Sequence, residues 1–269
     1  MGSPGESAPN AEPTSNPARL PRPIEQGRFR LSVADGEGAI DAALRLRFEV
    51  FNLELGEGLA SSWATGRDED ELDVQFHHLI VEDLQSRKIV GTYRLQTLEM
   101  ARAGRGFYST DEFDLSGFPA GILAEAVELG RACIARPYRS RQILFLLWKG
   151  LASYLSINGK RYLFGCSSLT SQEPAQGLAV FDDLCRRGFL HPTLRARPRP
   201  GSECEAPPDA APACGPVTIP TLFETYLRFG GTICGPPAID RAFRTIDFLT
   251  WLDTGTLDPG VRRMFFDEA

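Results

Sequence analysis

The chain has 269 residues, of which 42% are hydrophobic, 24% charged and 10% aromatic, and its formal net charge is -6. This composition is typical of a folded globular protein, and it excludes collagen-like, coiled-coil and wholly disordered chains. The acidic balance argues against a nucleic-acid-binding protein, because such a protein needs a basic face to neutralise phosphates.

Two segments are too poor in apolar residues to join a core. Residues 1–27 contain six prolines and show no hydrophobic periodicity, so we expect a disordered tail there. The Pro-rich segment from about 195 to 220 cannot bury enough apolar surface to offset its ordering entropy, and we expect a flexible surface insertion. Apart from this insertion, residues 28–269 are expected to form a single domain.

Hydrophobic periodicity and turn residues predict the secondary structure of this domain. In chain order, the expected elements are a strand at 28–33, a helix at 37–55, two strands at 78–81 and 89–98 joined by the polar turn 85–88, a strand at 125–135, a helix at 139–157, a strand at 162–167, a helix at 174–187, a helix at 222–229, and strand-like runs at 232–234 and 247–252.

The order of these elements indicates an α/β (α+β) fold. The two strands around the turn 85–88 form a hairpin, so pairing in the front half is antiparallel. The strand–helix–strand run from 125 to 167 is a crossover, which requires a parallel, right-handed pairing of its two strands. We therefore expect a mixed, mostly antiparallel sheet with one parallel crossover.

The cysteines and the apolar runs bear on the compartment. Six cysteines are scattered without a C-x-x-C pair, and the chain has three histidines, so no metal site is expected. Reduced thiols are the first interpretation, with a Cys204–Cys214 bridge inside the insertion as the alternative. No run reaches the roughly 18 apolar residues of a membrane span, and the N-terminus has no apolar signal core, so we expect a cytoplasmic protein.

An acidic cluster, Asp68, Asp70 and Asp73, precedes the strand at 78–81. A solvated loop is its ordinary interpretation, and a calcium loop is disfavoured because the spacing lacks the required Gly and Glu. In the functional interpretation these carboxylates hold an ammonium group or an arginine. Arg47 and Arg94 interrupt apolar faces, and each is either a surface arginine with a buried stem or a counter-charge to this cluster.

A Glu128-Leu-Gly-Arg131 run lies in an otherwise apolar strand. A buried Glu and Arg need partners, so a structural ion pair between them is the simple interpretation. Gly130 permits a bulge, which brings both side chains to one face and leaves a backbone N–H unpaired. Acyl transfer needs such a donor for an oxyanion and a base for an amine.

A basic turn, Arg136-Pro-Tyr-Arg139-Ser-Arg141-Gln142, leads into the helix at 139–157. An ordinary positively charged turn is one interpretation. The other is an anion site, made of helix N-terminal N–H groups and guanidinium groups, that suits a phosphopantetheine or pyrophosphate arm.

Taken together, several long motifs resemble a known family. The resemblance runs from about Arg28 to Phe266 and omits the insertion. The family is that of the ornithine N-alpha-acyltransferases, hemolysin-like members of the GNAT superfamily that make lyso-ornithine lipid. A more distant resemblance is to acyl-homoserine-lactone synthases and N-acyl amino acid synthases. The motifs that carry the resemblance are LRLRFEVF, DEDELD, HHLIVED, VGTYRL, GFYSTDEFDL, ELGRACI, YRSRQILFLLWKGLASYL, YLFGCSSL and TYLRFGGTICGPPAIDRAFRTIDFLTWLD.

The resemblance implies a GNAT fold, in which the two strands of the crossover splay to hold the acyl-carrier arm. It implies that Glu128, assisted by Asp70, deprotonates the acceptor amine, and that an N–H near Gly130 or Arg131 polarises the thioester carbonyl. The other implied site residues form two groups: Arg47, Asp68, Asp73 and Arg94 bind the acceptor or organise the site, and Cys133, Ile134, Arg139, Ser140, Arg141 and Gln142 bind the phosphopantetheine arm.

The implied reaction is transfer of a long-chain (3-hydroxy)acyl group from acyl carrier protein to the α-amine of ornithine, with no bound cofactor. The loop that GNAT enzymes write as (Q/R)-x-x-G-x-(G/A) reads RSRQIL here, and this departure favours acyl carrier protein over acyl-CoA as donor. The lipid product implies transient contact with the inner membrane. Three alternatives are another amino-acid acceptor such as Gly or Tyr, a signal synthase of the homoserine-lactone kind, and a non-catalytic lipid- or carrier-binding module.

Overall fold

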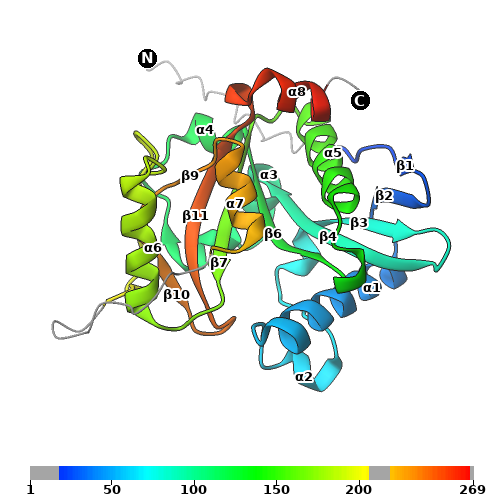
Figure 1. Cartoon of the computed structure of the whole chain (residues 1–269), viewed down its shortest axis with the longest axis horizontal. Helices are drawn as coiled ribbons and strands as arrows, with labels where there is room; N and C mark the ends of the chain where they lie inside the picture. The colour runs from blue at the N-terminus through cyan, green and yellow to red at the C-terminus, as the bar shows by residue number, and fades with distance from the viewer. Residues whose placement is uncertain (1–17, 206–218, 267–269) are drawn as a thin grey trace, which may run out of the picture.

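One nine-stranded sheet organises the computed structural model, which describes residues 18–205 and 219–266 (Figure 1). The strands are β1 (Ile24–Gln26), β2 (Phe29–Val33), β3 (His77–Asp83), β4 (Lys88–Thr97), β5 (Phe113–Asp114), β6 (Ala126–Ile134), β7 (Tyr162–Leu169), β8 (Arg197–Pro198), β9 (Thr232–Ile233), β10 (Ala238–Asp240) and β11 (Thr245–Asp253). The helices are α1 (Glu37–Phe48), η1 (Glu49–Leu55), α2 (Ser62–Thr65), η2 (Asp73–Gln75), α3 (Leu98–Ala103), η3 (Tyr108–Asp111), α4 (Ala120–Ala124), η4 (Arg136–Tyr138), α5 (Arg141–Ile157), α6 (Pro174–Arg186), α7 (Thr221–Arg228), η5 (Thr254–Thr256) and α8 (Pro259–Phe266).

The strand order of the large sheet is β1-β2-β3-β4-β6-β7-β11-β10, with β9 paired to β11. Among its described strands, neighbours pair antiparallel except β6 and β7, which are parallel and are joined by α5. β5 and β8 form a separate antiparallel pair. The mixed, mostly antiparallel sheet with one parallel crossover is therefore confirmed.

Helices cover both faces of the front half of the sheet. α5 packs on β2, β3 and β4, and α1 packs on β3, β4 and β6. In Figure 1, α5 lies above β3 and β4, and α1 lies below them. Side chains alternate along β4 accordingly: Tyr93 and Leu95 join the core under α5, whereas Arg94 and Gln96 make polar contacts on the other face.

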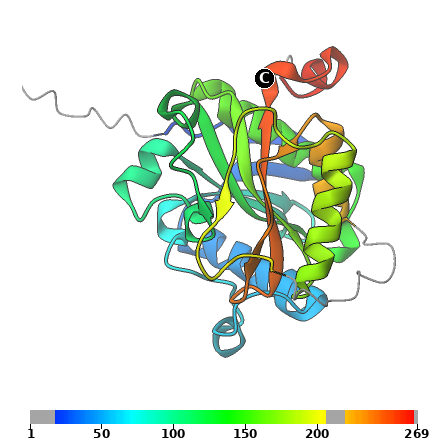
Figure 2. The same cartoon turned by 90° about the vertical axis from the view of Figure 1, so that its left-hand side faces the viewer.

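A second core fills the back half. α6 runs beside this part of the sheet (Figure 2), and its Val180 and Leu184 pack with Phe248 of β11. α7 joins the two cores, because Phe223 belongs to the core under α6 while Tyr226 packs against the core under α5. This position puts α7 beside the gap between β6 and β7.

Two boundaries differ from the sequence-based expectation. Residues 24–26 of the expected tail form β1 on β2, because Ile24 has an apolar partner in Leu31. Residues 195–205 of the expected insertion pack on the domain: Ala196 and Cys204 are buried, and β8 pairs with β5. Residues 1–17, and the insertion centre from 206 to 218 with Cys214, lie outside the described residues, and Cys204 is a free thiol.

The expected strands and longer helices are found close to their predicted bounds. The helix predicted at 37–55 is α-helical only to Phe48 and continues as the π-helical segment η1. Short elements without strong periodicity, such as β5, α4 and β10, were not predicted. In the described part of the chain, every helix is too short or too polar to cross a bilayer.

Candidate active site

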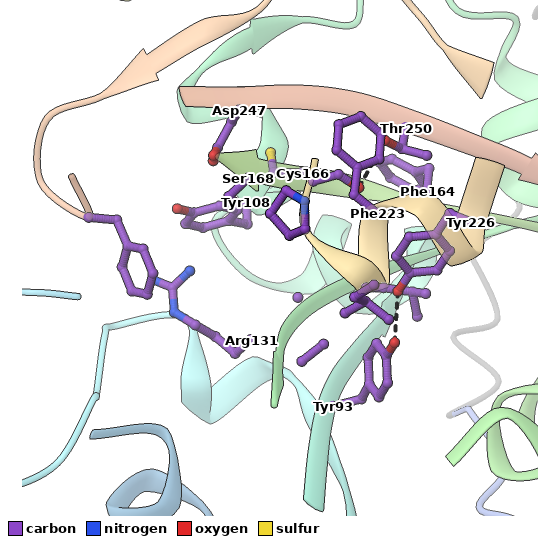
Figure 3. Close-up of a pocket in the computed structure, with 18 of the residues that line it drawn as sticks. Tyr93, Tyr108, Arg131, Phe164, Cys166, Ser168, Phe223, Tyr226, Asp247 and Thr250 are labelled. Atoms are coloured by element: carbon purple, nitrogen blue, oxygen red, sulfur yellow. Dashed lines mark hydrogen bonds between the residues drawn. The ribbon is translucent and has the colours of Figure 1, made fainter. Parts of the chain in front are cut away.

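A cavity of about 320 Å³ opens between β6 and β7. Residues 129–132 of β6 and 163–168 of β7 form its walls, and η1, α7 and β11 complete it. Its lining is divided into a polar and an apolar end: Figure 3 shows Tyr108, Cys166, Ser168 and Asp247 together, away from Tyr93 and Tyr226. A reactive group with a long apolar chain attached would fit such a division.

The gap exists because β6 and β7 stop pairing. Their parallel ladder ends at Glu128 and Phe164. The next residue of β7, Gly165, still lies against β6. A Cβ on Gly165 would be 2.2 Å from the Leu129 carbonyl oxygen, so no other residue fits there without a shift. Beyond that point β6 stays paired with β4 on one edge, while its other edge lines the cavity and has no ladder partner in β7.

A β-bulge shapes the β6 wall. Thr92 pairs with Cys133 and Arg94 pairs with Gly130, so Arg131 and the next residue together face the single residue Tyr93. Arg131 has a φ of 48°, a left-handed conformation that costs a non-glycine residue about 1 kcal/mol or more. The bulge places the Arg131 side chain on the same face of β6 as Glu128, as the sequence predicted. The sequence placed the flexible residue at Gly130, whereas the left-handed backbone conformation is that of Arg131.

Aromatic and aliphatic side chains form the apolar end. The Tyr93 and Tyr226 hydroxyl groups are 2.8 Å apart and hydrogen-bond each other, and burial raises the pKa of both, so they stay neutral. Leu129, Leu163 and Leu252 lie in the same wall, together with Leu222 and Phe223 of α7. The paired hydroxyl groups leave an apolar surface that suits an acyl chain.

Glu57 is a carboxylate at the polar end. It lies just after η1, between Gly56 and Gly58, whose φ angles are 70° and 83°. These two left-handed residues reverse the chain and point the side chain into the cavity, where its Oε1 accepts a hydrogen bond from Thr170. Burial raises the pKa of Glu57 to about 7, although the Thr170 hydrogen bond opposes this shift. A carboxylate with this pKa can accept a proton near neutral pH.

Two further acids lie beside Glu57. Asp247 of β11 lines the cavity and is 2% exposed, and Glu112 lies behind it with 5% exposure. Burial raises the pKa of Asp247 to about 6 and raises that of Glu112 as well, with Asp247 and Asp240 adding to the effect on Glu112. The polar end of the cavity is therefore acidic.

The acidic cluster from the sequence is a buried ion network, not a solvated loop. Asp68, Asp70 and Asp73 pair with Arg47, Arg94 and Arg131, three carboxylates with three guanidinium groups. Burial opposes ionisation of Asp73, but Arg47 and Arg94 outweigh it and lower its pKa. The contacts are Arg47 Nε to Asp68 Oδ1 (2.7 Å), Arg47 Nη1 to Asp73 Oδ1 (2.6 Å), Arg94 Nη1 to Asp70 Oδ1 (2.7 Å), Arg131 Nε to Asp68 Oδ1 (3.2 Å) and Arg131 Nη2 to Asp70 Oδ2 (3.3 Å).

This network ties α1 and the segment after α2 to β4 and β6. Arg131 both belongs to it and lines the cavity, where its guanidinium lies 4.0 Å from the centre of the Phe243 ring. The arginine-pairing interpretation of the acidic cluster is thus the one observed. Arg47 and Arg94 are not part of the described cavity lining, and their ion pairs neutralise the aspartates.

Glu128 is buried on the same face, but its carboxylate is fully occupied. Oε1 accepts from the Ser109 N–H (2.7 Å) and hydroxyl (2.5 Å), and Oε2 accepts from Gln96 Nε2 (2.6 Å) and the Tyr108 N–H (2.9 Å). The Glu128 side chain is not part of the described cavity lining. Its hydrogen bonds hold Tyr108 and Ser109 at the start of η3, and direct proton transfer to Glu128 stays a prediction.

The basic turn lies between β6 and α5, at the open end of the gap. Arg139 is held by Glu54 of η1 (Nη1 to Oε1, 2.5 Å), so it is partly neutralised. Ser140, Arg141 and Gln142 are exposed at the α5 N-terminus. Cys133 packs in a core with Phe51 and Phe243, and neither it nor Ile134 is part of the described cavity lining.

Comparison with known proteins places the chain in a family. Residues 46–149 match the model of the acetyltransferase (GNAT) domain. The L-ornithine N(alpha)-acyltransferase of Brucella abortus (strain 2308) is 34% identical over 233 residues, which cover 82% of this chain and 83% of that relative. The chain belongs to the L-ornithine N(alpha)-acyltransferase family.

Solved structures match this family member at low sequence identity. FeeM, an N-acyl amino acid synthase from uncultured soil microbes, superposes with a TM-score of 0.50 at 11% identity, covering 88% of this chain and 94% of that one. The acyl-homoserine-lactone synthase LasI matches with a TM-score of 0.46 at 10% identity, covering 89% and 95%. The sheet order, the splayed β6–β7 pair and the GNAT domain match together show a GNAT-type α/β fold.

Sequence reasoning missed the acids at the cavity of this acyltransferase family member. Glu57 lies in a Gly-Glu-Gly run, and a charged residue between two glycines after a helix is a signal that could have been noticed. Asp247 is an acid within a nearly continuous apolar strand, which was a second signal. Glu112 lies in an irregular segment, and nothing in the local sequence distinguishes it from a surface residue.

Proposed function

We propose that the protein is an N-acyltransferase that moves a long-chain (3-hydroxy)acyl group from acyl carrier protein to the α-amine of ornithine, forming lyso-ornithine lipid. The family relationship supports this reaction, because the Brucella abortus relative carries the name L-ornithine N(alpha)-acyltransferase. The observation that carries the proposal is the cavity between β6 and β7, which joins an apolar end to an end that holds Glu57.

The donor enters along β6 in this proposal. Leu129 to Ala132 line the cavity beyond the end of the β6–β7 ladder, and in this proposal the backbone groups on their β7-facing edge receive the amide-rich phosphopantetheine arm. The exposed α5 N-terminus at Ser140, Arg141 and Gln142 offers N–H groups and positive charge to its phosphate. The departure from the usual GNAT loop sequence supports acyl carrier protein as the donor, with acyl-CoA as the alternative.

The proposed reaction is direct transfer in a ternary complex. The acceptor nitrogen starts as an ammonium and loses two protons; it forms a bond with the acyl carbon, the carbon–sulfur bond breaks, and the carrier sulfur takes one of the protons and leaves as a thiol. Glu57 takes the other proton, directly or through a water, because it lines the cavity and has a pKa near 7. Arg131 is the one cationic side chain of the described cavity lining, and we place the acceptor carboxylate beside it, although its guanidinium also pairs with Asp68 and Asp70. Glu128 acts indirectly, by holding Tyr108 and Ser109.

The lipid product requires an apolar exit, and we propose that it leaves to the inner membrane at the cytoplasmic face. Leu55 lines the cavity and is 40% exposed, and its neighbour Leu53 is 56% exposed. Trp63 of α2 is also exposed. Leu55 thus gives the cavity an exposed apolar edge, which supports brief contact with a membrane surface or with the acyl carrier protein.

One assay tests the proposal. Purified protein is incubated with 3-hydroxyacyl carrier protein and, separately, with ornithine, glycine, tyrosine or no acceptor, and thiol release and lipid mass are followed. We expect thiol release and an acylated product of the right mass with ornithine, and more slowly with acyl-CoA as donor. Thiol release that does not depend on any amino acid, or donor binding without turnover, would contradict the proposal and favour a binding module.

A further inference from the structure

The acids behind Glu57 form a pair with unused hydrogen-bonding capacity. Asp247 Oδ1 and Glu112 Oε2 are buried and accept no hydrogen bond from any other group in the part of the chain that the structure describes; when one of the two carboxyl groups is protonated, they hydrogen-bond each other. Carboxylate oxygens of both residues lie within 4.8 Å of each other and of Cys166 Sγ. A buried acceptor without a partner is costly, so a donor that satisfies both oxygens would be bound strongly.

No nearby cation neutralises this pair among the described residues; burial and the neighbouring carboxylates instead raise the pKa of both acids, and a bound cation would favour their ionised forms. Asp240 adds a third carboxylate, which accepts hydrogen bonds from the Tyr108 hydroxyl (3.0 Å) and the Phe243 N–H (2.8 Å). The arginine that acts on Glu112 and on Glu57 is Arg131, whose guanidinium already pairs with Asp68 and Asp70. The acidic end therefore lacks a cation of its own among the described residues, unlike the neutralised Asp68–Asp70–Asp73 network.

We propose that Asp247 and Glu112 bind the side-chain ammonium of the acceptor and thereby select a diamino acid. This inference rests on the proposed function, because it takes the α-amine to be at Glu57 and the carboxylate near Arg131. An ammonium group offers three N–H donors, which match the two free carboxylate oxygens with one donor left for a neighbouring polar group. Asp247 lines the cavity, so the ammonium reaches the pair from the same space as the α-amine.

The test compares acceptors that differ only in the distal amine. Steady-state kcat/KM is measured with ornithine, with lysine and with norvaline, which has the ornithine carbon chain but no second amine. The variants are Asp247→Asn and Glu112→Gln, with Asp182→Asn on the exposed face of α6 as a control. We expect each site variant to lower kcat/KM for ornithine by on the order of 100-fold and to change kcat/KM for norvaline far less, so that the preference collapses.

A binding measurement keeps this inference separate from the reaction. Calorimetric titration of ornithine and norvaline into the donor-free protein should show a preference for ornithine that Asp247→Asn abolishes. If the wild type acylates ornithine but both site variants keep its preference over norvaline, the inference is wrong and the proposed function stands. If the wild type acylates no amino acid, the proposed function fails, and the titration alone then decides the inference.

The same residues could instead hold a metal ion, and the experiment covers that outcome. Equimolar Zn²⁺ binding that is lost in Asp247→Asn and in Cys166→Ala, with an unchanged ornithine preference, would overturn the ammonium assignment. Circular dichroism and thermal unfolding of each variant show whether it is folded. Because Asp247 and Glu112 are buried without counter-charges, we expect their neutral variants to be at least as stable as the wild type.

Discussion

Glu57→Gln is the most informative single substitution, because it removes a charge while keeping the size of the side chain. The amide oxygen of glutamine can still accept the hydrogen bond from Thr170. If Glu57 is the general base, we expect kcat for ornithine acylation to fall by about 10²- to 10⁴-fold. The wild-type kcat/KM should rise with pH up to about 7, the pKa of Glu57, since only the ionised carboxylate accepts a proton, and this acidic limb should be absent in Glu57→Gln.

The same variant has a calculable effect on stability. Folding raises the pKa of Glu57 from 4.5 to about 7, so the folded state binds the proton more tightly than the unfolded state. The free energy of unfolding should therefore fall as pH rises from about 4.5 to 7. Above pH 7 the fall is complete, and it totals about 3 kcal/mol. Glu57→Gln has no proton to lose, and it should be more stable than the wild type at pH 8 but similar at pH 4.5.

Two measurements check this reasoning. Urea denaturation at pH 4.5, 6 and 8 gives the difference in stability, and thiol release from the acyl donor between pH 5.5 and 9 gives the rate profile. Glu37→Gln, at the exposed start of α1, is the matched control and should change neither. A Glu57→Gln enzyme that keeps both its turnover and the acidic limb would refute the base assignment, even if the stability prediction were correct.

Three further substitutions test the framework of the site. Glu128→Gln places an amide among four hydrogen-bond donors, so it should cost about 1–3 kcal/mol in stability and lower kcat. The variant should keep the acidic limb of the kcat/KM profile; loss of that limb would return the base role to Glu128. Asp73→Asn breaks a buried ion network, and chemical denaturation should show a loss of about 3–5 kcal/mol; a loss under about 1 kcal/mol would mean that solvent screens the network. Gly165→Ala puts a methyl group 2.2 Å from the Leu129 carbonyl oxygen and should force β7 away from β6. Its acyl transfer should fall more than its stability, and unchanged thiol release would show that the width of the gap is unimportant.

The arginine–aspartate network explains why so many charges lie behind the cavity. Its three carboxylates and three guanidinium groups neutralise one another, and it joins α1 to β4 and β6. Arg131 carries the network to the cavity wall in a left-handed backbone conformation. Strain of this kind persists only when surrounding contacts enforce it, and here the ion pairs to Asp68 and Asp70 supply that restraint.

The sequence by itself determined the elements and the crossover. The period-3.6 stripe of α5, between two β-rich runs, was enough to require the parallel β6–β7 pair, because a strand–helix–strand unit has only one favoured handedness. The need of buried charges for partners was also readable: it anticipated the pairing of Arg47 and Arg94 with the acidic cluster. Local pattern was sufficient for these features because each depends on residues close together in the chain or on a general cost of burial.

Tertiary structure alone decided which carboxylates remain available. The sequence marks both Glu128 and Glu57 as acids close to glycines, but it does not show that one is saturated by four hydrogen bonds while the other faces a cavity with a single hydroxyl partner. The Glu112–Asp247 pair joins residues 135 positions apart, and its free oxygens depend on what packs around them. Desolvation and hydrogen-bond satisfaction are properties of the assembled environment, and no local pattern encodes them.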